Sequence, residues 1–276
     1  MIFISVTAPG GTGKTTTASL FVEGLSMLGI KPRLGQIEGD ERARLVKLAQ
    51  AWDRTLDMNI VIAKPSILRQ DPRRAQVQFA SLLEIFENTD KSIWVFDMAA
   101  TLSSSMFEVA ESLQHGDDCD QGSGIVFLVP TKAGDADRKL AAQDAIQKAH
   151  AIYKKSKIVL VINQGPLDST AQKKLADDIL RIGHSDSIAD HVTAVVHIPE
   201  EPSVLTKRLF EANNIPHGTI INYAPADLAK VLDMPRIEAK LEQQHHAQWY
   251  NSVMEQIKNL LRVLKIPARS KGGDAS

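Results

Sequence analysis

Glycines, a lysine and threonines cluster near the N-terminus with the types and spacing that bind a phosphate. The segment reads Pro9-Gly10-Gly11-Thr12-Gly13-Lys14-Thr15-Thr16. Glycines let backbone N–H groups curl around an anion because no Cβ stands in the way. A helix that begins near Gly13 would point its unpaired amides and the positive end of its dipole at the same phosphate. Lys14 can then neutralise the outer phosphates of a nucleotide, and the Thr15 hydroxyl can bind Mg²⁺.

The flanking segments place this cluster between a strand and a helix, as a phosphate-binding P-loop requires. Residues 2–7 form an apolar, strand-like run, and residues 13–28 show a helical pattern. Ala8 stands where the usual P-loop has its first glycine, and a small residue is expected to serve at that turn. The alternative is a glycine turn that binds no ligand. At average residue usage, three glycines at this spacing followed by Lys and Thr recur by chance about once in 10⁶ positions, which favours the P-loop.

Two aspartates that follow strand-like runs are candidates for the rest of a nucleotide site. Asp97 ends the apolar run 93–96, and Asp40 follows the second strand-like run, 33–37. Ligand-binding groups of α/β proteins lie at the carboxyl ends of strands. We therefore expect Asp97 to bind Mg²⁺ through water and Asp40 to orient an attacking water. The alternative for each aspartate is a helix N-cap, and for Asp40 the two roles are compatible.

Strand-like and helical segments alternate along the chain, which predicts an α/β fold with a mostly parallel sheet and helices on both faces. The expected strands are 2–7, 33–37, 93–96, 124–129, 157–162 and 192–198. The expected helices are 13–28, 40–52, 72–87, 104–114, 138–153, 169–182 and 203–212. Residues 58–63 fit either an edge strand or a helical insertion. Residues 115–123 are predicted to form a solvated loop, because their order fits no metal-ligand spacing.

A last helix is predicted from Pro235 to about residue 266, and it sets the division into domains. We expect a P-loop domain over residues 1–234 and a C-terminal helix with a basic tail over residues 235–276. Apolar residues recur at helical spacing through 249–264, which favours a helix docked on the same domain. The alternatives are a contact with DNA and a helix on a membrane surface. Either would use the positive positions Lys258, Arg262, Lys265, Arg269 and Lys271.

Composition limits the class of protein. The chain has 276 residues and a formal net charge of −1, so any contact with nucleic acid or membrane must come from a local patch. Its single cysteine, Cys119, excludes an intramolecular disulfide framework and suits a reducing compartment. The N-terminus has no signal-peptide pattern, and no stretch approaches the roughly 20 apolar residues of a membrane span. These features predict a cytoplasmic protein.

The motifs together resemble those of the deviant Walker A ATPases of the MinD/ParA type. Beyond the P-loop, the second strand ends in acid-x-Asp and the third ends in Asp97. Residues 159–162 followed by Asn163 are similar to the family strand that ends in an adenine-contacting asparagine. The segment Ile-Pro-Glu-Glu at 198–201 is similar to the family's Ile-Pro-acid-acid loop, and 214–216 is similar to the Gly-x-Pro-like segment downstream of it. The resemblance covers roughly residues 1–220.

This resemblance implies a SIMIBI-like P-loop NTPase fold, binding of ATP and Mg²⁺, and slow hydrolysis that a partner protein stimulates. It places ATP against Pro9, Gly10, Gly11, Thr12, Gly13, Lys14, Thr15, Thr16, Asn163 and Pro199. It assigns catalysis to Lys14, Asp40 and Asp97, and the metal to Thr15 and Asp97. A nucleotide-dependent homodimer is implied as well, with a role in plasmid partition, plasmid stability or conjugative transfer.

One departure concerns the family's signature lysine, which lies directly before the two glycines and reaches the other subunit's phosphates. Pro9 occupies that position, so we expect ATP to promote dimerisation weakly. Arg69, Arg73 and Arg74 are candidate substitute cations. Two alternative functions stay open. One is a dethiobiotin synthetase-like ligase or kinase of a small molecule, a branch that also lacks the lysine. The other is a scaffold that binds nucleotide without hydrolysing it.

Overall fold

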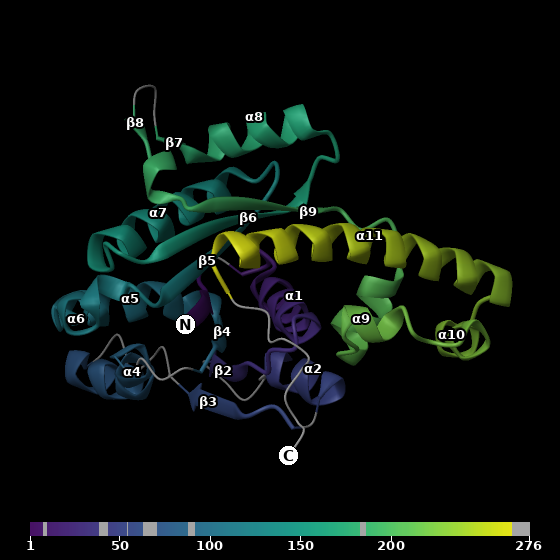
Figure 1. Cartoon of the computed structure of the whole chain (residues 1–276), viewed down its shortest axis with the longest axis horizontal. Helices are drawn as coiled ribbons and strands as arrows, with labels where there is room; N and C mark the ends of the chain where they lie inside the picture. Colours follow the sequence, from purple (N-terminus) through teal and green to yellow (C-terminus); the bar gives the residue numbers. More distant parts are fainter. Residues whose placement is uncertain are drawn as a thin grey trace, which may run out of the picture.

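A parallel sheet forms the centre of the molecule (Figure 1). The computed structural model describes residues 1–7, 10–38, 44–53, 55–62, 71–87, 92–182 and 186–266. Within these residues, seven strands pair in the order β3-β2-β4-β1-β5-β6-β9, with every neighbouring pair parallel. They are β1 (Ile2–Ser5), β2 (Arg33–Glu38), β3 (Met58–Ile62), β4 (Trp94–Met98), β5 (Ile125–Lys132), β6 (Lys157–Gly165) and β9 (Ala194–Pro199). Two short strands, β7 (Arg181–Ile182) and β8 (Asp186–Ser187), form a separate antiparallel pair.

Helices cover both faces of this sheet, which confirms the predicted α/β class. They are α1 (Lys14–Met27), α2 (Arg44–Trp52), α4 (Pro72–Glu87), α5 (Ser103–Ser112), α6 (His115–Asp118), α7 (Ala136–Ile152), α8 (Ser169–Leu180), α9 (His217–Ile220), α10 (Pro225–Leu232) and α11 (Arg236–Val263). Alternate residues of a strand point to opposite faces. In β1, Ile2 and Ile4 accordingly join the core under α4, α5 and α7, whereas Phe3 joins the core under α1 and α11.

Several predicted elements differ in detail from the structure. Residues 58–63 fit either an edge strand or a helical insertion from sequence, and they contain the edge strand β3. The predicted helix 203–212 contains a π-helix at Thr206–Glu211. The predicted solvated loop 115–123 is wrong. His115 begins the short helix α6 and is buried, and its ring nitrogens lie 3.0 Å from the Tyr153 hydroxyl and 3.1 Å from the Leu83 carbonyl oxygen.

Helix α11 packs against α1 and runs beside β9 (Figure 1). Apart from the exposed Val263, the apolar residues from Trp249 through Leu264 are buried in the same core as α1. The two helices approach closely at Gly24, where a Cβ would lie 2.7 Å from Cγ2 of Ile257. Among the described helices, none combines the length and the apolar character needed to cross a bilayer. The division of the chain at residue 234 stays a prediction.

Candidate functional site

The P-loop joins the central strand of the sheet to α1. After β1, the backbone takes positive φ values at Gly11 (77°) and Gly13 (89°), which glycine adopts without steric cost. Gly13 is the N-cap of α1, and Lys14 begins the helix. A Cβ at Gly13 would lie 2.6 Å from the Asn163 amide nitrogen, so the position accepts only glycine. The first amides of α1 therefore follow a turn that contains glycines without a Cβ, as an anion site requires.

Thr15 and Asp97, the two predicted metal ligands, are in direct contact. The Thr15 hydroxyl donates a hydrogen bond of 2.6 Å to Oδ2 of Asp97. Thr15 lies in the first turn of α1, and Asp97 lies in β4, where it pairs in register with Ser5 of β1. Asp97 is only 3% exposed. A hydroxyl and a carboxylate are the hard oxygen donors that Mg²⁺ prefers, so the pair fits that ion.

Asn163 links the P-loop to the end of β6. Its side-chain amide donates a hydrogen bond of 2.6 Å to the carbonyl of Thr12. The sequence predicted that this strand ends before Asn163, but β6 continues to Gly165 and pairs with β5 and β9 along this extension. This extension places the asparagine at the carboxyl end of β6, beside the phosphate-binding loop.

A pocket of about 170 Å³ lies where these segments meet. The P-loop lines one side of it, together with Asn163, and the end of β9 lines another through Ile198 and Pro199. Helix α11 holds this wall in place, because the Trp249 indole N–H donates a hydrogen bond of 2.9 Å to the Pro199 carbonyl. Asn163 and Pro199 thus line one cavity with Gly11, Thr12, Gly13 and Thr16.

Arg138 of α7 is a cation beside the P-loop that the sequence analysis did not single out. A Cβ at Gly11 would lie 3.1 Å from Nη2 of Arg138, so the guanidinium reaches the loop backbone. Asp135 holds the arginine through two contacts. Its Oδ1 accepts a hydrogen bond of 3.1 Å from the Arg138 backbone N–H, which caps α7, and its Oδ2 pairs with Nε of Arg138 at 3.2 Å. The signal in the sequence was Asp-x-x-Arg at the start of a helix that follows a strand.

Among the described residues, Arg73 and Arg74 do not line the pocket. Pro9, Asp40 and Arg69 lie outside the described residues, as do Arg269 and Lys271 of the basic tail. Arg73 and Arg74 are exposed at the start of α4, where Arg74 pairs with Asp71 at 3.5 Å.

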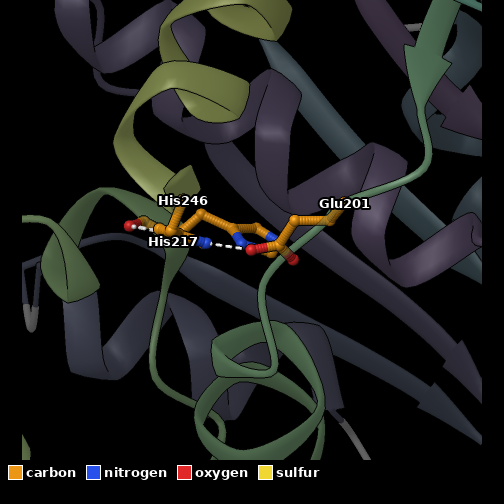
Figure 2. A group of neighbouring side chains, drawn as sticks. All are labelled: Glu201, His217 and His246. Carbon is orange, nitrogen blue, oxygen red and sulfur yellow. Dashed lines mark hydrogen bonds and ion pairs between the residues drawn. The ribbon is translucent and has the colours of Figure 1, made fainter. Parts of the chain in front are cut away.

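A buried polar cluster adjoins the pocket and was also missed from sequence. Figure 2 shows Glu201, from the loop after β9, meeting His246 of α11 and His217 of α9. The Glu201 carboxylate contacts Nδ1 of His246, and Nε2 of His246 lies 3.3 Å from the His217 carbonyl oxygen. Burial lowers the pKa of His217 well below its usual range, so that ring is neutral. Glu201 and His217 also line the pocket.

Comparison with known proteins identifies the fold. No protein-family model and no curated protein sequence matches the chain. Among solved structures, it is similar to that of pNOB8 ParA, with 14% identity and a TM-score of 0.51 over 96% of this chain and 98% of the other. It is also similar to the MinD cell division protein of Aquifex aeolicus, with 14% identity and a TM-score of 0.48 over 92% and 96% of the two chains. The chain therefore has the fold of the ParA structure, as its motifs predict.

Proposed function

We propose that this protein binds Mg-ATP and hydrolyses it slowly, as a regulatory or positioning ATPase of the ParA/MinD type. The observation that carries the proposal is the 2.6 Å contact between Thr15 and Asp97, directly beside a helix capped by Gly13. That arrangement combines an anion-binding helix start with two hard oxygen donors for a divalent cation.

Each residue of the site then has a distinct task. Lys14 neutralises the outer phosphates, and Thr15 and Asp97 hold the ion, Asp97 through a water. Bound Mg²⁺ supplies neutralisation of the negative charge that develops during phosphoryl transfer. Asp40 orients the attacking water. Asn163 and Pro199 contact the base, and adenine is favoured because Asn163 is followed by Gln164 rather than by an aspartate that would pair with guanine.

Arg138 supplies the positive charge that the residue at position 9 lacks. A second cation beside the phosphates lowers the barrier to phosphoryl transfer by stabilising negative charge, and some P-loop NTPases provide an arginine from the same chain. Because Asp135 orients the guanidinium over Gly11, this charge acts within one subunit and needs no dimer. Arg138 therefore takes the place proposed above for Arg69, Arg73 or Arg74.

The test separates nucleotide binding from metal binding and from hydrolysis. Asp97→Asn keeps an acceptor for Thr15 but removes the charge, so ATP should still bind weakly without Mg²⁺ while the gain from Mg²⁺ is lost. Asp40→Ala should leave Mg-ATP affinity unchanged and lower single-turnover hydrolysis by about 10²-fold or more. Asp144→Asn, an exposed change on α7, is the matched control.

Three outcomes would contradict the proposal. If Asp97→Asn responds to Mg²⁺ like the wild type, Asp97 is not part of the metal site. A wild-type protein that binds Mg-ATP but never hydrolyses it, with or without DNA or lipid vesicles, would be a nucleotide-binding scaffold instead. Efficient turnover that depends on a small carboxylate would indicate the ligase or kinase alternative.

A further inference from the structure

The cluster of Glu201, His217 and His246 (Figure 2) has no task in the proposed ATPase site, although Glu201 and His217 line the pocket. Its members come from the loop after β9, from α9 and from α11. Both imidazoles are fully buried, and all three ligand atoms lie within 4.8 Å of one another.

The hydrogen bonds of His246 leave two acceptors facing each other. Nε2 of His246 lies 3.3 Å from the His217 carbonyl oxygen, which can only accept, so Nε2 carries the hydrogen. In a neutral ring Nδ1 then carries a lone pair, and it is directed at the carboxylate of Glu201. Two lone pairs at contact repel, so the two atoms must share a positive centre. A proton fits the contact as it stands, whereas a metal cation would hold the two atoms further apart, each at its own coordination distance.

His217 argues for the metal cation. Neither of its ring nitrogens has a hydrogen-bond partner within the part of the chain that the structure describes, and the same holds for Oε2 of Glu201. Buried polar atoms in native proteins almost always have a partner, and an exception points to a missing water or ion. A proton shared between His246 and Glu201 would leave both ring nitrogens of His217 without a partner, whereas one cation can bind one of them together with His246 and Glu201.

We propose that Glu201, His217 and His246 bind a zinc ion. Imidazole nitrogens and a carboxylate oxygen are ordinary zinc ligands, and three protein ligands leave a fourth position for water. The hydrogen bond from His246 to a backbone carbonyl is the second interaction that metal-bound histidines make to fix their tautomer. The ion would join three segments, and its location beside Pro199 and Trp249 would hold the wall of the pocket. The site stands independently of nucleotide binding.

The first experiment measures zinc in the full-length protein. The protein is stripped with a chelator, incubated with Zn²⁺ in the presence of excess Mg²⁺, desalted and analysed by mass spectrometry for metal content. We expect about one zinc per chain in the wild type and at least tenfold less in Glu201→Gln and in His217→Phe, which keeps the aromatic stack on Phe210. Asp97→Asn should retain zinc, because the P-loop site is separate.

Matched controls exclude adventitious binding at other histidines. His245 is the exposed neighbour of His246 on α11, and His191 stacks on His150 at 3.9 Å. His245→Gln and His191→Gln should both keep the full zinc content. Zinc that persists in Glu201→Gln and His217→Phe, or that is lost in either control, would overturn the proposal.

A second measurement uses the wild type alone, so it does not depend on whether a variant folds. Co²⁺ replaces zinc and gives visible absorption bands when nitrogen and oxygen ligands hold it in a tetrahedral site. We expect these bands to develop in the stripped wild type up to about one equivalent, and we expect Zn²⁺ to abolish them and to raise the melting temperature. A wild-type protein that gives neither bands nor thermal stabilisation contains no such site.

Discussion

At the scale of single residues, the site depends on contacts between parts of the chain that lie far apart in sequence. Thr15 and Asp97 are 82 positions apart, and Asn163 is 151 positions from the Thr12 carbonyl that it binds. The identities of these residues and their places at strand ends could be predicted, because a parallel sheet brings the carboxyl ends of its strands to one edge. For Arg138, Asp-x-x-Arg indicates only a capped helix start, because the reach of the guanidinium to Gly11 depends on how α7 packs against the loop.

Arg138→Ala tests the charge that the structure places beside the P-loop. Removing a cation that stabilises the transition state should lower single-turnover ATP hydrolysis at least about tenfold, with a smaller effect on affinity. Lys139→Ala is the control, since Lys139 is its neighbour and pairs with Asp178. Equal hydrolysis rates for the two variants would show that Arg138 has only a structural role.

At the scale of elements, the hydrophobic pattern of the sequence predicted the sheet and most helices. It did not indicate which polar residues are buried. His217 and His246 are 29 positions apart on different helices, so no local spacing relates them. His115 misled the prediction for a similar reason. Its surroundings in sequence are acidic and glycine-rich, yet Leu83 and Tyr153, both distant in sequence, enclose it.

The packing of α11 is tested by two neighbouring substitutions. Leu261 is fully buried, whereas Val263 is 62% exposed. Leu261→Ala should lower the free energy of unfolding by about 2–5 kcal/mol, because it leaves a cavity in the core shared with α1. Val263→Ala should change it by less than about 0.5 kcal/mol in chemical denaturation. Similar values for both would mean that α11 is not docked as the structure shows.

A buried carboxyl on α1 makes the junction of α1, α9 and α11 sensitive to pH. Glu23 is buried, accepts a hydrogen bond of 2.9 Å from the Gly218 N–H, and has a pKa that burial raises from 4.5 to about 7. The folded state therefore holds a proton that the unfolded state releases between these values. The stability that this proton contributes is complete below about pH 4.5 and is lost as pH rises through about 7.

Glu23→Gln imitates the protonated carboxyl and should abolish this dependence. Between about pH 5 and about pH 8, the free energy of unfolding of the wild type should fall relative to that of the variant by roughly 2–3 kcal/mol. Denaturant titrations of both proteins at each pH measure the difference and cancel the other titrating groups. A difference that does not change with pH would show that Glu23 is ionised in the folded protein.

At the scale of the whole molecule, we propose that a partner protein or a surface brings two subunits together, because Pro9 cannot supply a charge to a second subunit. Lys258, Arg262 and Lys265 lie at the C-terminal end of α11, whose apolar side is buried. These cations can meet DNA or anionic lipid while the helix stays docked. The wider role that we propose is plasmid partition, plasmid stability or conjugative transfer.

Sedimentation of the full-length protein tests this arrangement. ATP alone should produce few dimers, and binding to plasmid DNA or to anionic vesicles should weaken as salt increases, because it depends on counterion release. Reversing the charge of Lys258, Arg262 and Lys265 should abolish the binding and leave the fold intact. Strong ATP-dependent dimers without a partner would show that Pro9 matters less than we propose.

Calorimetric titration of Mg-ATP into the wild type and into Lys14→Ala tests the central claim most directly. Lys14 is only 8% exposed and begins the helix that follows the P-loop. Loss of its charge from a buried phosphate site should weaken ATP binding at least about 30-fold, or ~2 kcal/mol. Lys148→Ala, which breaks an exposed pair with Asp144, should bind like the wild type. Unchanged ATP affinity in Lys14→Ala would contradict the account.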